Sequence, residues 1–402
     1  MRVGIIDSGI DLCRLYDGSR HGYDVHWIPV TAISFASVAG CDLLIIPTGT
    51  DLLHLQQARD ILRLYRARGG WIYCFDGPAA ALFGDAGWTH SPTQHRLQTL
   101  HACDAALHFL LEQVALEQLS CKEGVRGWWC EGELHGVGLV PLIVDGAGRV
   151  IAASAPRPEG AGMLLLTAAA RLPLFSDQPE LAANRLFANL LDWRRHTPSP
   201  APRPLHLYLH SGNWAQSSFL ASARFGQRFH GVHWSLLDAS LLAQATSIWV
   251  PWESNTLALK IAWPLLDEAI KAGATLVVED LRDDWIPGVS WQARPVDSNW
   301  WREGRPLALQ REPALAKVFG DASATVYFWH YHGVFQGPVA AEPLLTAPDG
   351  QTILALLPPS SSSKGQMILG TLDATFEYGA GKIPETADFI AAVLQFIEGP
   401  VA

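Results

Sequence analysis

The sequence predicts an α/β protein built from two tandem domains with mainly parallel sheets. Short apolar runs alternate with segments of helical spacing, as in parallel strands covered by helices on both faces. The order of these runs in the first half recurs in the second. Between the halves, four prolines occur in the eight residues 197–204. We therefore predict domains over 1–197 and 205–402, joined by an extended linker at 198–204.

Composition limits the classes of partner. The 402 residues include 29 Lys and Arg against 39 Asp and Glu, for a net charge of −10, and no basic block occurs. Nucleic acid and anionic membrane surfaces are therefore poor candidates. No apolar stretch is long enough for a transmembrane helix, and the first residues do not read as a signal peptide. The six cysteines form no CxxC pair, so we expect a cytoplasmic protein without disulfides.

The first elements of the two halves correspond in order. Each half opens with a strand, at 2–7 and at 205–210, and continues with a second strand that contains Val-His-Trp. An apolar run ending at Pro47 or Pro251 follows in each. Apolar residues at i, i+3, i+4 and i+7 then predict a helix over 52–68 and over 257–271. A further apolar run follows each helix, at 70–76 and at 273–279.

The later elements correspond as well. Both halves contain a His-Gly-Val string, which makes His135 and His332 candidate equivalents. A β-hairpin is predicted next in each half, because Asp-Gly separates two apolar runs at 145–146 and at 349–350. Each half closes with one more strand, at 160–167 or 364–371, and a helix, at 180–195 or 384–397. The sequence thus predicts a duplication of one domain of about 200 residues.

This pattern resembles the class I glutamine amidotransferase-like superfamily, which has a flavodoxin-like fold. The resemblance lies in an apolar strand ending Pro-Thr-Gly-Thr, a helix, and the run Gly-Gly-Trp-Ile-Tyr-Cys-Phe-Asp-Gly-Pro-Ala, and it extends over both halves. It is closest to atypical branches such as the N-terminal domain of biotin–protein ligases and the trehalose-utilisation-like proteins. The resemblance implies an elbow after the central strand, where active members carry a nucleophilic cysteine. Neither half has that cysteine or a late His-x-Glu, so glutamine hydrolysis is not expected.

Four residues are candidates for chemistry. Counting from the glycine before the strand places Asp76 and Glu279 at the elbow, where a carboxylate can act as acid or base. His135 and His332 could pair with them. Two alternatives remain open: the acids cap the following helices, and the histidines are hydrogen-bonded structural residues.

Other residues are candidates for ligand binding. The Ser-Gly pairs after the first strands, Ser8-Gly9 and Ser211-Gly212, could offer backbone N–H groups to an anion. Aromatic and imidazole groups near strand ends could contact a ligand, namely Trp252, Trp329 and His330. The alternatives are ordinary turns and core aromatics. We expect no metal and no cofactor, because a third and a fourth metal ligand are not evident beside His330 and His332.

Three functions follow from these observations. The first is a non-catalytic protein that binds a small molecule, a glycan or a partner protein. The second is a hydrolase or transferase that uses Asp76 with His135, or Glu279 with His332. The third is a subunit of a larger assembly, with exposed tryptophans at its interface. The sequence specifies neither the ligand nor the oligomeric state.

Overall fold

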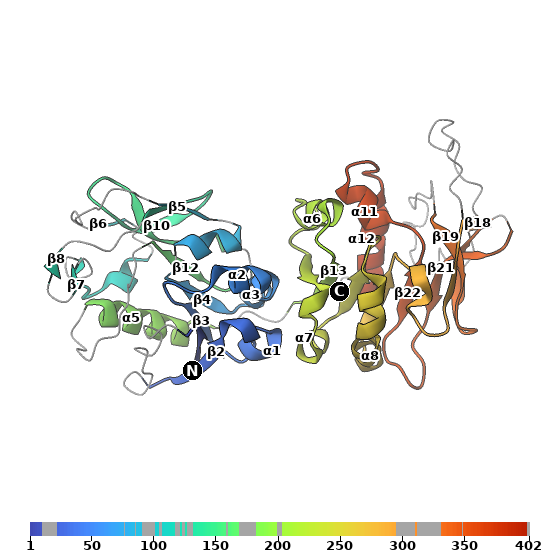
Figure 1. The fold of residues 1–402 in the computed structure, drawn as a ribbon, viewed down its shortest axis with the longest axis horizontal. Helices are drawn as coiled ribbons and strands as arrows, with labels where there is room; N and C mark the ends of the chain where they lie inside the picture. The colour runs from blue at the N-terminus through green and yellow to red at the C-terminus, as the bar shows by residue number, and fades with distance from the viewer. Residues whose placement is uncertain are drawn as a thin grey trace. The chain divides into compact units, whose positions relative to one another are not determined.

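The computed structural model forms two compact units, residues 1–203 and 204–402. The structure describes residues 1–9, 22–75, 77–84, 86–90, 101–103, 107–116, 121–122, 125–126, 132–157, 160–168, 182–198, 203–294, 310–311, 331–347 and 349–399. Each unit is a mixed α/β structure with a mainly parallel sheet (Figure 1).

The sheet of the first unit has a parallel half and an antiparallel half. Its strand order is β2-β1-β3-β4-β12-β11-β10-β6, parallel from β2 to β12 and antiparallel beyond it. The strands are β1 (Arg2–Asp7), β2 (Asp24–Pro29), β3 (Leu43–Ile46), β4 (Trp71–Cys74), β6 (His101–Ala102), β10 (Val140–Val144), β11 (Val150–Ser154) and β12 (Leu164–Thr167). The central strands are buried along their whole length, which explains why they appear in the sequence as continuous apolar runs.

The second unit repeats this order with β14-β13-β15-β16-β22-β21. Beyond β21 the sheet continues antiparallel through β19 to β17, and β20 also pairs with β21 and β18. The strands are β13 (His206–His210), β14 (Phe229–His233), β15 (Ser247–Val250), β16 (Thr275–Val278), β17 (Ser290–Ala293), β18 (Gln310–Arg311), β19 (Gly333–Gln336), β20 (Glu342–Thr346), β21 (Thr352–Leu357) and β22 (Met367–Gly370). The predicted hairpins are present in both units, as β10–β11 and β20–β21.

Helices follow the parallel strands in both units. In the first unit they are α1 (Phe35–Val38), α2 (Leu52–Gln57), α3 (Arg59–Ala67) and α5 (Ala182–His196), with 3₁₀ turns η3 (Val30–Ala32), η4 (Pro78–Phe83) and η5 (His108–Leu111). In the second they are α6 (Trp214–Leu220), α7 (Ala239–Leu242), α8 (Thr256–Ala272), α11 (Ala374–Gly379) and α12 (Thr386–Glu398), with η6 (Trp234–Leu236) and η7 (Arg282–Asp284). The single helix predicted over 52–68 is two helices, because Ala58 departs from helical geometry at φ −87 and ψ 4.

Two short two-strand sheets complete the first unit. They pair β5 (Gly87–His90) with β9 (Gly132–His135), and β7 (Cys121–Lys122) with β8 (Val125–Arg126). In β9, Gly132 lies where a side chain would meet the indole of Trp88. Gly333 of β19 lies in the same way against Trp291 of β17. The β5–β9 and β17–β19 pairs are therefore the same structural element in the two units.

This correspondence corrects the alignment based on His-Gly-Val. When Gly132 is aligned with Gly333, His135 corresponds to Gln336 and not to His332. The shared Val-His-Trp string is also out of register by three residues. His26 pairs with Gly4 on β1, and the residue that occupies its place in the second unit is His230, paired with Leu207 on β13. Both strings lie in corresponding elements, but their identity is coincidental.

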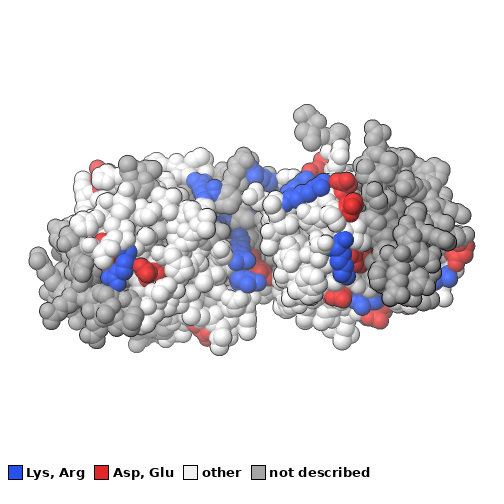
Figure 2. All heavy atoms as spheres, turned by 90° about the horizontal axis from the view of Figure 1, so that it is seen from above, with Lys and Arg blue, Asp and Glu red and all other residues white. Residues whose placement is uncertain are grey.

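Charge is scattered on the face that Figure 2 shows. Lys and Arg atoms are interspersed there with Asp and Glu atoms among uncharged ones. Within the described part of the chain, no helix is long and apolar enough to cross a membrane.

Candidate functional site

The second unit brings several predicted site residues together at the carboxyl ends of its parallel strands. This is the edge where ligands of open α/β sheets usually bind. It lies toward the top of Figure 1, where α6 and α11 follow β13 and β22. Asp76, Trp329 and His330 lie outside the described residues.

The counterpart of Glu279 in the first unit differs from the one predicted by counting residues from the preceding glycine. The N–H of Glu279 donates to the carbonyl of Val250 at 2.8 Å, and in the first unit the N–H of Phe75 donates to the carbonyl of Ile46 at the same distance. The β3–β4 and β15–β16 registers agree with this match. Phe75 is therefore the counterpart of Glu279, and continuing the register makes Asp280 the counterpart of Asp76. The equivalence of Asp76 and Glu279 was wrong by one residue.

The carboxylate of Glu279 is buried and hydrogen-bonded. Only 4% of the residue is exposed. Thr375 donates to it twice, from its backbone N–H at 3.1 and 3.2 Å and from its hydroxyl at 2.6 Å. Tyr208 in turn donates its phenol to the Thr375 hydroxyl at 3.1 Å. Burial raises the pKa of Glu279 to about 8, against the hydrogen bonds from Thr375, which lower it. Glu279 thus ties the central strand β16 to the start of α11.

Asp280, the next residue, is also enclosed. It is 0% exposed, and Arg282 donates to its two carboxylate oxygens from Nε at 2.8 Å and from Nη2 at 2.6 Å. The backbone N–H of Ser254 donates to it at 3.1 Å. Both acids after β16 therefore have partners inside the protein.

His332 pairs with Asp373 rather than with an elbow acid. Its Nε2 lies 3.1 Å from Oδ2 of Asp373. The imidazole stacks on Trp252, with ring centroids 3.6 Å apart and ring planes at 11°. The guanidinium of Arg282 lies 4.4 Å from the centroid of the same indole. Trp252, predicted as a ligand contact, is thus packed against two of the protein's own side chains.

Glu377, on α11, is buried as well, as are Glu279, Asp280 and Asp373. It is 5% exposed, and Lys382 lies 3.5 Å from its Oε1. Burial, followed by the nearby Asp373, raises the pKa of Glu377 to about 7. Sequence analysis missed Thr375, Asp373 and Glu377. Asp373 could have been found, because it lies just past the last strand of the sheet, where ligand-edge residues are expected.

The Ser-Gly pairs are already engaged in local contacts. The N–H of Gly9 donates to Asp7 at 2.8 Å, and the hydroxyl of Ser8 accepts from the N–H of Asp51 at 3.0 Å. The N–H of Ser211 donates to the side-chain amide oxygen of Gln216 at 2.8 Å. These groups shape the turns after β1 and β13, as the structural alternative expected, and Gly212 adopts a positive φ, which glycine allows.

His135 lies apart from this cluster. It is an exposed residue at the end of β9 in the first unit, and its ring covers Gly87 on β5. Among the described residues no group of three or more His, Cys, Asp and Glu side chains is arranged to hold a metal.

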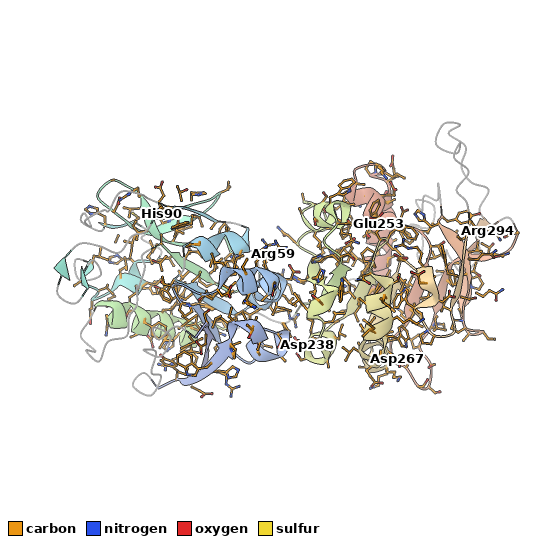
Figure 3. The ribbon with its side chains drawn as sticks, in the orientation of Figure 1. Arg59, His90, Asp238, Glu253, Asp267 and Arg294 are labelled. Carbon is orange, nitrogen blue, oxygen red and sulfur yellow. The ribbon has the colours of Figure 1, made fainter. Side chains whose placement is uncertain are left out.

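The outward face of the same edge carries an exposed tryptophan. Trp214, the first residue of α6, is 62% exposed and lies 6.4 Å from the ring of Phe376 on α11. The ammonium of Lys382 lies 5.4 Å from the Phe376 ring. Asn213 donates to Glu253 at 3.1 Å, and Figure 3 shows Glu253 at this end of the unit, near α6. We call Asn213, Trp214, Glu253, Phe376 and Lys382 the edge surface.

Comparison with known proteins gives a distant structural likeness. No protein-family model and no curated protein matches the sequence. Among solved structures, the chain is similar to the mmIFT52 N-terminal domain at 11% identity and a TM-score of 0.34, over 49% of this chain and 98% of that one.

Two glycoside hydrolases are also similar. The exo-β-1,4-mannosidase Op5Man5 from Opitutaceae bacterium strain TAV5 has 12% identity and a TM-score of 0.29, over 50% of this chain and 36% of the enzyme. The α-L-fucosidase isoenzyme 2 from Paenibacillus thiaminolyticus has 9% identity and a TM-score of 0.30, over 57% of this chain and 38% of the enzyme. The chain matches little more than a third of either enzyme. Likeness at this level carries no inference about function.

Proposed function

We propose that this chain is a duplicated, non-catalytic protein of the glutamine amidotransferase-like type, and that its second unit binds a ligand at the edge surface. The observation that carries the proposal is the burial of Glu279 and Asp280. A nucleophile or general base at an elbow must reach a substrate. These carboxylates are 4% and 0% exposed and are bound by Thr375 and Arg282.

The first unit supports the same proposal. Its residue at the place of Glu279 is Phe75, which is 1% exposed and packs on Tyr73 with ring centroids 3.8 Å apart. An apolar side chain at this point cannot transfer a proton or attack a carbonyl. The two units therefore differ at this position, while Asp76, the elbow acid predicted for the first unit, lies outside the described residues.

A hydrolase that pairs Glu279 with His332 has less support. Glu279 bonds to Thr375, and His332 bonds to Asp373 and stacks on Trp252. Each of these groups serves the packing of the loops that follow β15, β16 and β22. We therefore interpret them as supports that hold the edge surface in one conformation before a ligand binds.

The edge surface has the features of a recognition site. An exposed indole supplies a large rigid apolar face, while the amide of Asn213, the carboxylate of Glu253 and the ammonium of Lys382 supply hydrogen bonds around it. Such a combination suits a sugar ring, and it also suits a protein side chain at an interface. The ligand experiment must separate the two.

Binding is tested with the purified chain and two tryptophan variants. Wild type is applied to a glycan array and, separately, cross-linked in lysate, and Trp214→Ala is compared with Trp27→Ala. Trp27 is 37% exposed on β2 of the first unit and serves as the matched control. We expect a ligand or partner that Trp27→Ala retains and Trp214→Ala loses. If every ligand found binds Trp214→Ala as well as wild type, the edge surface is not the site.

A further inference from the structure

Three buried carboxylates meet where α11 leaves the sheet. Glu279, Asp373 and Glu377 are 4%, 4% and 5% exposed. Asp373 and Glu377 are one helical turn apart, with the N–H of Glu377 donating to the carbonyl of Asp373 at 2.9 Å, and Glu279 at the end of β16 accepts from Thr375 between them. Two basic side chains touch them, His332 at 3.1 Å from Asp373 and Lys382 at 3.5 Å from Glu377. The cluster therefore holds more acids than bases in a place with little water.

The elements around the cluster add little compensating charge. The helix α6, which packs on α11, has no charged residue in Trp214–Leu220. On β13, Tyr208 reaches Glu279 only through the hydroxyl of Thr375.

Three other acids near the cluster have partners of their own. On α12, Asp388 pairs with Arg224, and after β16, Asp280 pairs with Arg282. After β15, Glu253 is exposed and accepts from Asn213. Full ionisation would thus place three negative charges together against the two bases.

The helix that carries these acids is packed tightly on α6. A Cβ built on Gly379 of α11 would lie 2.1 Å from the carbonyl oxygen of Ala215 on α6, so the two backbones touch. Trp214 and Phe376 meet beside this contact. Helices in such close backbone contact do not separate by small continuous shifts, because packed interfaces switch between discrete arrangements. An ionised cluster would therefore separate α11 from α6 as a body rather than by a gradual shift.

We propose that α11 is held against α6 while a proton is bound in the Glu279–Asp373–Glu377 cluster, and that it detaches when the cluster loses this proton. Detachment would let water reach the carboxylates and would separate Phe376 from Trp214. The elevated pKa values of Glu279 and Glu377, about 8 and about 7, place this loss near neutral pH. The sign follows from linkage: the docked state binds the proton more tightly, so rising pH favours the undocked state.

Amide hydrogen exchange of the full chain tests the proposal. Exchange of residues 374–379 is measured between about pH 6 and about pH 9 and corrected for the intrinsic pH dependence of amide exchange. We expect protection of these amides to fall about tenfold or more over this range, while β1 and β3 of the first unit keep theirs. Glu377→Gln and Glu279→Gln each keep a neutral side chain of the same shape and should reduce the fall to about threefold or less. The matched control is Glu342→Gln, an exposed acid at the start of β20, which should behave as wild type.

The result in wild type decides the question even if a variant folds poorly. Constant protection of α11 across the pH range would overturn the proposal. An equal fall in the protection of α11 in wild type and in Glu377→Gln would overturn it as well. Ligand binding at the edge surface is measured at about pH 6, where α11 is expected to be docked, with Trp214→Ala, so the two proposals fail separately.

Discussion

The buried carboxyl group of Glu279, at the end of β16, should make the stability of the second unit depend on pH. An acid whose pKa is higher in the folded than in the unfolded chain stabilises fully below its unfolded pKa, and this stability is lost as pH rises through its folded pKa. For Glu279 the ordinary value is 4.5 and the folded value about 8. The loss of stability should therefore occur between these two values.

The variant Glu279→Gln should remove most of this dependence. Because the amide has no charge to bury, its unfolding free energy should stay flatter between about pH 5 and about pH 8, where one linked proton contributes up to about 1.4 kcal/mol per pH unit. Urea denaturation at a series of pH values measures it, with Glu342→Gln as the control. Parallel pH profiles for wild type and Glu279→Gln would contradict the assignment of the linked proton to Glu279.

Arg282 neutralises a carboxylate that has no access to solvent. Arg282→Ala would leave Asp280 buried without its partner, and we expect a loss of about 2–4 kcal/mol in the unfolding free energy of the second unit. Lys271 offers a comparison, because it pairs with the exposed Asp267 and Glu268 on α8. Lys271→Ala should cost clearly less than Arg282→Ala, because solvent screens the ion pairs of Lys271. Equal losses for the two variants, measured by urea denaturation, would show that burial of Asp280 is not what makes the pair matter.

At the scale of elements, the contact between α6 and α11 depends on a missing side chain. Gly379→Ala places a methyl group against the carbonyl of Ala215, so the helices must separate, at a cost of about 1–3 kcal/mol. Gly40→Ala is the control, since its new methyl would lie 3.6 Å from a flexible arginine, and it should change stability by less than about 0.5 kcal/mol. Thermal unfolding measures both. If the Gly379→Ala and Gly40→Ala proteins melt at the same temperature, the backbones of α6 and α11 are not in contact.

Elements were predictable from the sequence, whereas their registers were not. The continuous apolar run of β3 and the Asp-Gly turn between β10 and β11 are local signals, because burial on both faces and turn geometry each act on neighbouring residues. Which residue of β4 corresponds to which residue of β16 is fixed by hydrogen bonds to other strands. A count from the preceding glycine was wrong by one, and it put Glu279 opposite Asp76 instead of Phe75.

The site was predictable only in outline for the same reason. The rule that ligand-edge residues follow strands selected Glu279, Trp252 and His332, which do lie near one another. It could not say that His332 bonds to Asp373 or that Thr375 binds Glu279, since these partners are about 40 and 100 residues apart in sequence and meet only in the folded sheet.

At the scale of the whole molecule, two compact units with separate sheets should unfold separately. Calorimetry of the full chain should resolve two transitions, and Arg282→Ala or Gly379→Ala should lower only the one that belongs to residues 204–402. The units expressed as 1–203 and 204–402 provide reference transitions. A single transition that shifts as a whole in either variant would mean that the units fold cooperatively.

The stacking of His332 on Trp252 gives the second unit an optical property. An imidazole in contact with an indole alters the fluorescence of that indole. With the ring centroids 3.6 Å apart and the ring planes nearly parallel, the emission of Trp252 should depend on whether His332 stays stacked on it. Trp252 would therefore report, without any added dye, on the position of the imidazole that faces Asp373.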